Sequence, residues 1–256
     1  MTFIADIGFY DRSGYERAIT MQQMHEHGEI IKAGDASYIK WSPNEGVELW
    51  AKFTGGKIDL NLHPYFFGKS RMRVALIEKM VRANQAISEG AFLCRNKPCL
   101  GRDWIAGQLP FVFDTPNYDL YDDIQLPRLS EVQLTAFAFS ATGYEDEDEY
   151  WEANPRDEEG YGFEPEHFIP TTYTQPRGEN NELQPACAEI SGLVLDTDII
   201  TNEATGLDFC WAKLQTIGGE VDMVCAPRCL EGYLVTGGIA MTHAYLSGRL
   251  IKDTSN

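Results

Sequence analysis

The chain has 256 residues, and its 39 aspartates and glutamates outweigh 21 lysines and arginines, giving a formal net charge of -18. A field of that sign repels the phosphate backbone of nucleic acids and anionic lipid surfaces, so we expect neither as a partner. The beginning of the chain lacks the cationic and apolar regions of a secretory signal, and six cysteines are too few for a disulfide scaffold, which together predict a cytoplasmic protein with reduced thiols.

The first predicted element is a helix from Ser13 to about His27. Ser13 and Glu16 have the spacing of a capping box, in which each of the two side chains accepts a backbone N–H at the start of a helix. Gly28 follows as a stop signal.

One segment then occurs twice in diverged form. Residues 44–68 read NEGVELWAKFTGGKIDLNLHPYFFG, and residues 202–232 read NEATGLDFCWAKLQTIGGEVDMVCAPRCLEG. The copies share, in order, Asn-Glu, Trp-Ala-Lys, Gly-Gly and a later Asp. Apolar and polar residues alternate on both sides of each Gly-Gly pair, which predicts a tight β-hairpin, because glycine supplies the positive φ that hairpin turns require.

The turn sets the register of each hairpin, because side chains alternate between the two faces of a strand. In the first copy the predicted buried pairs are Phe53/Ile58, Ala51/Leu60 and Leu49/Leu62. The opposite face of that hairpin is predicted to pair Lys52/Asp59, Trp50/Asn61 and Glu48/His63. In the second copy the predicted pairs are Lys213/Asp222, Ala212/Met223, Trp211/Val224 and Cys210/Cys225.

Two further helices are predicted between the copies. From Ser70 to about Ser88, apolar residues recur at helical spacing, namely Met72, Leu76, Met80, Ala83 and Ile87. The segment Ser130-Glu-Val-Gln133 repeats the capping-box pattern and predicts the start of another helix. Residues 109–114 (LPFVFD) predict a short strand, and residues 90–104 predict irregular chain.

Residues 145–182 form an acidic segment with 13 acidic and 2 basic side chains. The segment also contains six aromatic residues, which disordered acidic tracts usually lack. We therefore expect a long connection that lies on the surface and docks by its aromatic side chains. After it, residues 187–200 predict a strand that leads into the second hairpin, and residues 237–251 predict a closing strand pair that turns at Ser247-Gly248.

Together these elements predict an α+β protein, mainly antiparallel β, with two related β-hairpin modules arranged as a barrel or sandwich and about three helices. The predicted parts are an N-terminal β-module with helices (1–144), an acidic connecting segment (145–186) and a C-terminal β-module (187–256). The three parts are also compatible with one compact unit.

Linear motifs of catalysis and cofactor binding are missing from the sequence, including phosphate-binding loops, nucleophile elbows and dinucleotide fingerprints. Cys225 and Cys229, with Cys210 opposite, would bring three thiolates together, and Cys94 and Cys99 form a second pair at the loose end of zinc-ligand spacing. Because nothing in the sequence shows that the second pair meets the first, we expect buried free thiols and predict no metal and no cofactor.

Two classes of function remain open. The first, which the sequence favours, is a non-catalytic binding protein of the immunity or inhibitor type that engages a basic protein partner. Clustered carboxylates steer encounter and aromatic side chains supply contact energy, so its predicted contact residues are Glu145, Asp146, Glu147, Asp148, Glu149, Tyr150 and Trp151.

The second class of function is a metal-assisted hydrolase in a cleft between the β-modules, with candidates Asp59, His63, Asp222 and His243.

Overall fold

The structure is a computed structural model, and it describes residues 3–10, 14–34, 36–54, 57–58, 61–81, 90–100, 105–171 and 185–251. Strands dominate these residues, and most neighbouring strands run antiparallel, which confirms a sheet-rich protein with mixed α and β content. The described residues contain two α-helices, α1 (Gly14–His27) and α2 (Glu147–Ala153), beside short 3-10 helices. Neither α-helix in this part of the chain combines the length and the apolarity needed to cross a bilayer.

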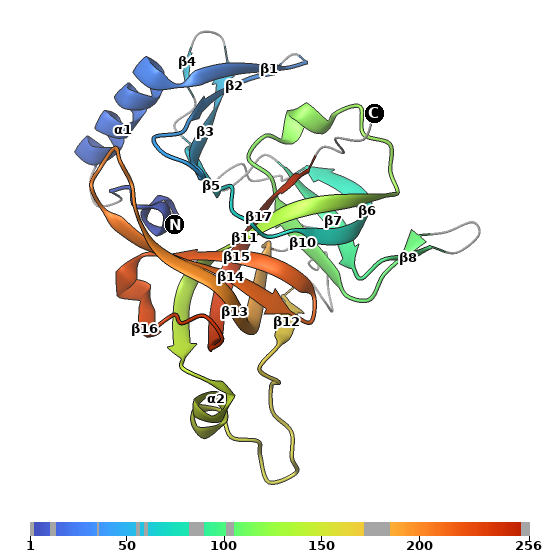
Figure 1. Ribbon diagram of the computed structural model, residues 1–256. Coiled ribbons are helices and arrows are strands. Elements are labelled where there is room, and N and C mark those ends of the chain that lie inside the picture. The colour runs from blue at the N-terminus through green and yellow to red at the C-terminus, as the bar shows by residue number, and fades with distance from the viewer. Residues whose placement is uncertain are drawn as a thin grey trace.

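The smaller sheet lies beside α1 and is built from the first part of the chain (Figure 1). Its strands are β1 (Glu29–Ala33), β2 (Ala36–Trp41), β3 (Val47–Thr54), β4 (Lys57–Ile58) and β5 (His63–Phe66). They follow the order β1-β2-β3, and β3 then pairs with both β4 and β5. The prediction of helix α1 is confirmed, and its end at Gly28 is marked by a hydrogen bond from the Gly28 N–H to Met24 O. Ser13, the proposed cap, lies outside the described residues.

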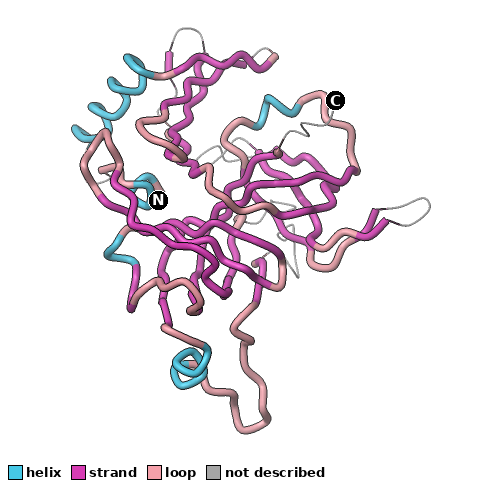
Figure 2. The backbone as a smooth tube through the Cα atoms, in the orientation of Figure 1, coloured by secondary structure: helices cyan, strands magenta, loops and turns pink. Residues whose placement is uncertain are grey.

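The larger sheet has ten strands and occupies the centre and right of the molecule (Figures 1 and 2). These are β6 (Met72–Val81), β7 (Gly90–Asn96), β10 (Pro110–Asp114), β11 (Arg128–Tyr144), β12 (His167–Pro170), β13 (Cys187–Thr201), β14 (Asp208–Thr216), β15 (Gly219–Cys225), β16 (Leu230–Gly232) and β17 (Ile239–Leu250). A separate small pair joins β8 (Cys99–Leu100) to β9 (Ile105–Ala106).

The long antiparallel pair of β11 and β17 is the centre of this sheet. It runs from Val132 opposite Leu250 to Tyr144 opposite Ile239. The pair belongs to two closed cycles of strand pairing, one through β13, β14 and β15 and the other through β10, β7 and β6. Strands from both sides of the acidic segment are therefore hydrogen-bonded in one sheet.

Aromatic side chains join the two sheets in a shared core. Phe66 of β5 lies 5.7 Å from Phe209 and 6.4 Å from Trp211 of β14, measured between ring centroids. Phe3, just before the 3-10 helix η1 (Ile4–Ile7), stacks on Tyr245 of β17 at 4.7 Å. The N-terminus thus packs against the last strand, and the core contains residues from nearly the whole length of the chain.

The helix predicted from Ser70 to Ser88 is wrong over its described part, because residues 72–81 form strand β6. The residues that suggested a helix, Met72, Leu76 and Met80, are four apart, and a spacing of four fits a period of two as well as a period of 3.6. In β6 all three are buried. Residues 82–89 lie outside the described part of the chain.

The helix predicted from Ser130 is also wrong, because the whole stretch belongs to strand β11. Residues 132–138 are buried without interruption. A strand covered on both faces is apolar at successive positions and does not alternate. That covering on both faces removed the period-two signal from the sequence.

Three shorter segments were also predicted, and the structure corrects two of these predictions and confirms the third. Residues 90–104 were predicted as irregular chain, but their described part forms β7 and β8. The closing pair with a turn at Ser247-Gly248 is one continuous strand, β17, in which a Cβ on Gly248 would lie 2.8 Å from the Phe113 ring. Gly248 is thus explained by close packing and not by a turn. The short strand predicted at 109–114 is confirmed as β10.

The second hairpin is confirmed in register, as β14 and β15. Its partners are Cys210 with Cys225, Trp211 with Val224, Ala212 with Met223 and Lys213 with Asp222, all as predicted. The strand predicted over 187–200 is confirmed as β13.

The predicted register of the first hairpin is correct only beside its turn, where Phe53 faces Ile58. Further along, Trp50 faces His63 and Glu48 faces Tyr65, so the predicted pairs Trp50/Asn61, Leu49/Leu62 and Glu48/His63 are wrong by two residues. The predicted partners Asp59 and Leu60 lie outside the described residues. The two copies nevertheless meet at their starting points, since the Asn44 side chain donates to Thr201 O and accepts from the Glu203 N–H. Their common origin stays a prediction.

Candidate functional sites

The acidic segment forms an arm, residues 145–166, that extends away from the sheets (Figures 1 and 2). It starts with helix α2, whose N-terminus is capped by Asp146, because the Asp146 carboxylate accepts the Glu149 N–H at 2.9 Å. Three acidic residues occupy the first helical turn, where the helix dipole favours negative charge. The local sequence therefore specifies this helix despite its high charge.

The arm is held by specific contacts along its length. Tyr150 is fully buried, and its hydroxyl donates to Phe163 O at 3.0 Å, which ties the helix to the returning chain. Arg156 bonds both carboxylate oxygens of Glu164, at 2.9 and 3.2 Å. The Asp157 side chain accepts the N–H of Tyr161 and closes the turn at the tip. The arm is thus an ordered feature of the protein surface.

The predicted contact residues fall into two groups. The carboxylates Glu145, Asp146, Glu147, Asp148 and Glu149 are all exposed. Tyr150 is an anchor inside the arm, and Trp151 is partly covered by Arg156, whose guanidinium lies 4.6 Å from the ring centroid. These two aromatic side chains therefore support the arm and present little surface to a partner.

The exposed aromatic side chains of the arm are Tyr161 and Phe163, with exposed fractions of 71% and 55%. They were not among the predicted contact residues. The signal that could have found them is the sequence Gly160-Tyr-Gly-Phe163, because two aromatics interleaved with glycines suit a turn at the surface better than a core. Around them, residues 145–166 contain eleven acidic side chains and a single cation, Arg156.

The candidates for a hydrolytic site do not form one group. Asp59 lies outside the described residues. His63 is buried opposite Trp50 in the smaller sheet, and His243 is exposed on β17, 5.0 Å from the Phe139 ring. Along β11, the partner of His243 is Ser140 and the partner of Asp222 is Thr135, so the two candidates are offset by about 17 Å along the strand at ~3.3 Å per residue, on strands at opposite edges of β11.

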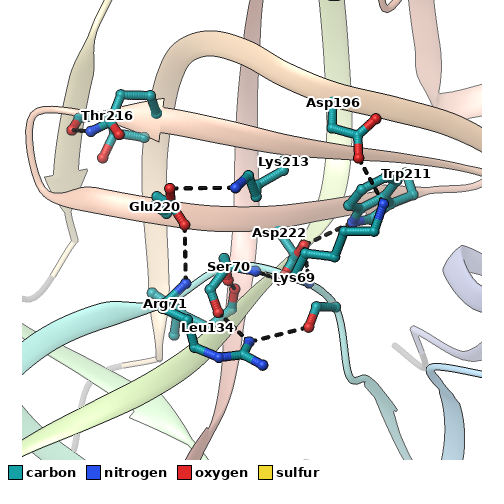
Figure 3. A network of polar contacts seen from close by, with 12 residues as sticks. Lys69, Ser70, Arg71, Leu134, Asp196, Trp211, Lys213, Thr216, Glu220 and Asp222 are labelled. Atoms are coloured by element: carbon teal, nitrogen blue, oxygen red, sulfur yellow. Dashed lines mark hydrogen bonds and ion pairs between the residues drawn. The ribbon is translucent and has the colours of Figure 1, made fainter.

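Asp222 is fully buried and accepts hydrogen bonds from four donors, and Figure 3 shows it beside Lys69, Ser70 and Trp211. The donors are Lys69 N at 3.1 Å, Ser70 N at 2.9 Å, Gln133 Nε2 at 2.6 Å and Trp211 Nε1 at 2.8 Å. Each carboxylate oxygen accepts two of these hydrogen bonds. Asp222 therefore ties the segment before β6 to β15 and β11, and it has a structural role in this core.

Gly68 makes this arrangement possible. A Cβ at position 68 would lie 2.3 Å from the Asp222 carboxylate. Because such a contact is impossible, only glycine lets the backbone approach Asp222 closely enough for the N–H groups of the next two residues to reach it.

Two of the cysteines, Cys210 and Cys225, form a pair across the second hairpin. Cys210 and Cys225 face each other across β14 and β15, and the Cys225 thiol hydrogen-bonds to the Cys210 sulfur. This contact lowers the pKa of Cys210 to about 7, whereas the same contact and burial raise the pKa of Cys225. In the described part of the chain, no three side chains of His, Cys, Asp or Glu lie close enough together to hold a metal ion.

No protein-family model matches this chain, and neither does any curated protein or solved structure.

Proposed function

We propose that this protein binds a basic protein partner through the acidic arm, residues 145–166, in the manner of an immunity or inhibitor protein. The observation that carries the proposal is the pair of exposed rings, Tyr161 and Phe163, at the tip of an arm whose other side chains are predominantly acidic. Exposed aromatic side chains are typical anchors of protein interfaces, and surrounding carboxylates accelerate encounter with a cationic surface.

The internal order of the arm supports the same proposal. A binding segment that is already folded loses less conformational entropy on association than a flexible one. The helix cap at Asp146, the hydrogen bond of Tyr150 and the clasp between Arg156 and Glu164 all fix the arm before a partner arrives. These contacts use few of the carboxylates, so most of the charge stays exposed to solvent.

The test compares three forms of the protein as bait in a lysate of its native cells. The first is the unmodified protein, and the second is an arm variant with Tyr161→Ala and Phe163→Ala. The third is a matched control with exposed apolar residues replaced elsewhere, Tyr233→Ala and Ile199→Ala, which are 78% and 67% exposed. Basic proteins retained by the first and third forms but lost by the second support the proposal, and equal capture by all three contradicts it.

A second comparison tests the charge. The variant Asp148→Asn, Glu152→Gln, Glu158→Gln, Glu159→Gln removes four exposed carboxylates from the arm. Its control, Glu29→Gln, Glu45→Gln, Glu203→Gln, Glu231→Gln, removes four exposed carboxylates from other surfaces. For a captured partner, we expect the arm variant to lower the association rate by about tenfold at low salt, because exposed charges act mainly on encounter. An equal effect of the two sets would assign the attraction to overall charge and contradict the role of the arm.

A further inference from the structure

A cavity of about 870 Å³ lies where the smaller sheet meets β11, β17 and the 3-10 helix η2 (Tyr118–Tyr121). Its walls include Lys40 of β2, Trp50 of β3 and Phe67 after β5 on one side, and Tyr121, Arg128 and Arg249 on the other. Cavities of several hundred Å³ that combine apolar walls with a few polar groups are the usual binding sites of small molecules.

The charge of this cavity is opposite to that of the protein. Lys40, Arg128 and Arg249 line it, and Asp123 is the carboxylate among its lining residues. Behind the wall, Glu48 binds Lys40 at 3.3 Å and Arg249 at 2.7 Å. Three cations against two carboxylates leave one net positive charge, in a chain whose total is -18. A cavity lined by an excess of one sign of charge attracts ligands of the opposite sign, which here are anions.

Arg249 is the central cation, and aromatic rings hold it in place. Its guanidinium lies 5.4 Å from the Trp50 centroid, 5.2 Å from Tyr65 and 5.3 Å from Phe67. Nη1 is engaged by Glu48, and 22% of the Arg249 side-chain surface stays exposed. The guanidinium therefore keeps donors that an anionic ligand in the cavity can bind.

The remaining walls of the cavity are suited to the apolar part of an anionic ligand. The ring of Trp50 is buried at the base, and Phe67 and Leu120 are exposed by 38% and 39%. Ile31, Ile124 and Leu250 extend the apolar lining. Inorganic phosphate would leave this surface unused, and a dianion would exceed the single net positive charge.

We propose that this cavity binds a small organic monoanion, a carboxylate attached to an aromatic or aliphatic body, with Arg249 and Arg128 as the charged contacts. The carboxylate accepts from the guanidinium groups of Arg249 and Arg128, and the apolar part of the ligand lies against Trp50 and Phe67. This binding site is separate from the acidic arm and does not depend on its role.

The test is calorimetric titration of the full chain with 4-phenylbutyrate and with octanoate. Their neutral amides, 4-phenylbutyramide and octanamide, and inorganic phosphate serve as matched probes. We expect the carboxylates to bind at least about tenfold more tightly than the amides, since a hydrogen bond to a charged group is worth that much. We expect phosphate to bind more weakly than either carboxylate. Equal affinity for carboxylate and amide, stronger binding of phosphate, or no binding of either carboxylate would overturn the proposal.

Three variants connect the binding to these residues. Arg249→Gln and Arg128→Gln should each lower the affinity for 4-phenylbutyrate by about tenfold. Lys32→Gln makes the same charge change on β1, one residue from the lining Ile31 but exposed on the opposite face, and should change the affinity less than about twofold. Because Arg249 also pairs with Glu48, circular dichroism must show that its variant folds. Arg128 is exposed, so its variant keeps the test decisive if Arg249→Gln unfolds. Unchanged affinity in a folded Arg249 variant and in the Arg128 variant would refute the site.

Discussion

Glu48 and Arg249 lie 201 residues apart in the sequence, and Arg249 Nη1 donates to Glu48 Oε2 at 2.7 Å. The same carboxylate accepts from Trp50 Nε1 at 2.7 Å and pairs with Lys40 at 3.3 Å. Glu48 thus joins β3 of the smaller sheet to the last strand of the larger one. It also balances part of the positive charge at the wall of the cavity.

Replacing Glu48 should destabilise the protein substantially. Glu48→Ala leaves the Trp50 N–H and the Arg249 guanidinium without this acceptor, and removing one partner of a largely buried pair costs about 2–4 kcal/mol. Glu48→Gln keeps one acceptor oxygen and should cost less. Urea unfolding measures both, and the order Ala worse than Gln is the expected result. No loss of stability in either variant would contradict the role given to this carboxylate.

Asp222→Asn should be among the most damaging single substitutions in the chain. In one orientation the NH2 group of asparagine faces the donors of Lys69 and Trp211, and in the other it faces those of Ser70 and Gln133. At least one buried donor is therefore left unpaired. We expect a loss of about 3–5 kcal/mol in the free energy of unfolding.

The matched control is Asp196→Asn. Asp196 pairs with Lys69 at 2.7 Å, but both side chains are largely exposed. Exposed ion pairs contribute less than about 1 kcal/mol. The same chemical change should therefore have a small effect at position 196. Similar losses in the free energy of unfolding at both positions would mean that the burial of Asp222 does not determine its contribution to stability.

Asp222 also shows how far the sequence could predict this protein. The predicted register of the second hairpin places Lys213 opposite Asp222, and that register is correct. However, Lys213 bonds Glu220 at 3.4 Å instead, and Asp222 accepts its four donors from distant segments and from Trp211. Local alternation and the Gly-Gly turn determined the register. The role of Asp222 depends on partners up to 153 residues away, which no local pattern contains.

The wrongly predicted helices have a related cause. Residues 72–81 and 130–144 became strands because β11 is paired along both edges, with β6 and β17 at one end and with β15 and β17 in the middle. Helical spacing and capping patterns are local preferences, and tertiary pairing overrides them. The cavity could not be predicted either, because Lys40, Arg128 and Arg249 come from three strands that only the fold brings together.

Loss of the phenolic proton of Tyr118 should lower the free energy of unfolding at alkaline pH. Burial, with smaller contributions from Asp122 and Asp119, raises its pKa to about 12. The unfolded chain releases the phenolic proton near pH 10, so the folded state holds that proton more tightly. This contribution is complete below about pH 10 and is lost as the pH rises toward 12.

Tyr118→Phe tests this directly, because it removes the titrating hydroxyl and keeps the ring that packs 6.4 Å from Phe92. The free energy of unfolding is measured against pH from 8 to 12. The fall above pH 10 should be shallower in the variant by up to about 2 kcal/mol. As a control, Tyr161→Phe changes an exposed tyrosine and should leave the profile unaltered. Identical slopes for Tyr118→Phe and the unmodified protein would contradict the prediction.

The pair of Cys210 and Cys225 should give one reactive thiol and one inert thiol. The hydrogen bond from the Cys225 thiol stabilises the Cys210 thiolate, which lowers the pKa of Cys210 to about 7 although burial and Asp208 oppose the shift. Thiolates are the reactive form, so the rate of Cys210 modification by a small reagent such as methyl methanethiosulfonate should rise with pH around a midpoint near 7. Cys225 should stay unmodified in the same range because its pKa is raised. Mass spectrometry of the peptides separates the two sites.

Cys225→Ala removes the donor, and the midpoint for Cys210 should then move above that of an ordinary thiol, because burial becomes the main influence on its pKa. Cys225→Ser keeps a donor and should leave the midpoint low, which separates the hydrogen bond from any loss of packing. If the alanine variant retains the midpoint near 7, the thiol of Cys225 is not what stabilises the charge on Cys210.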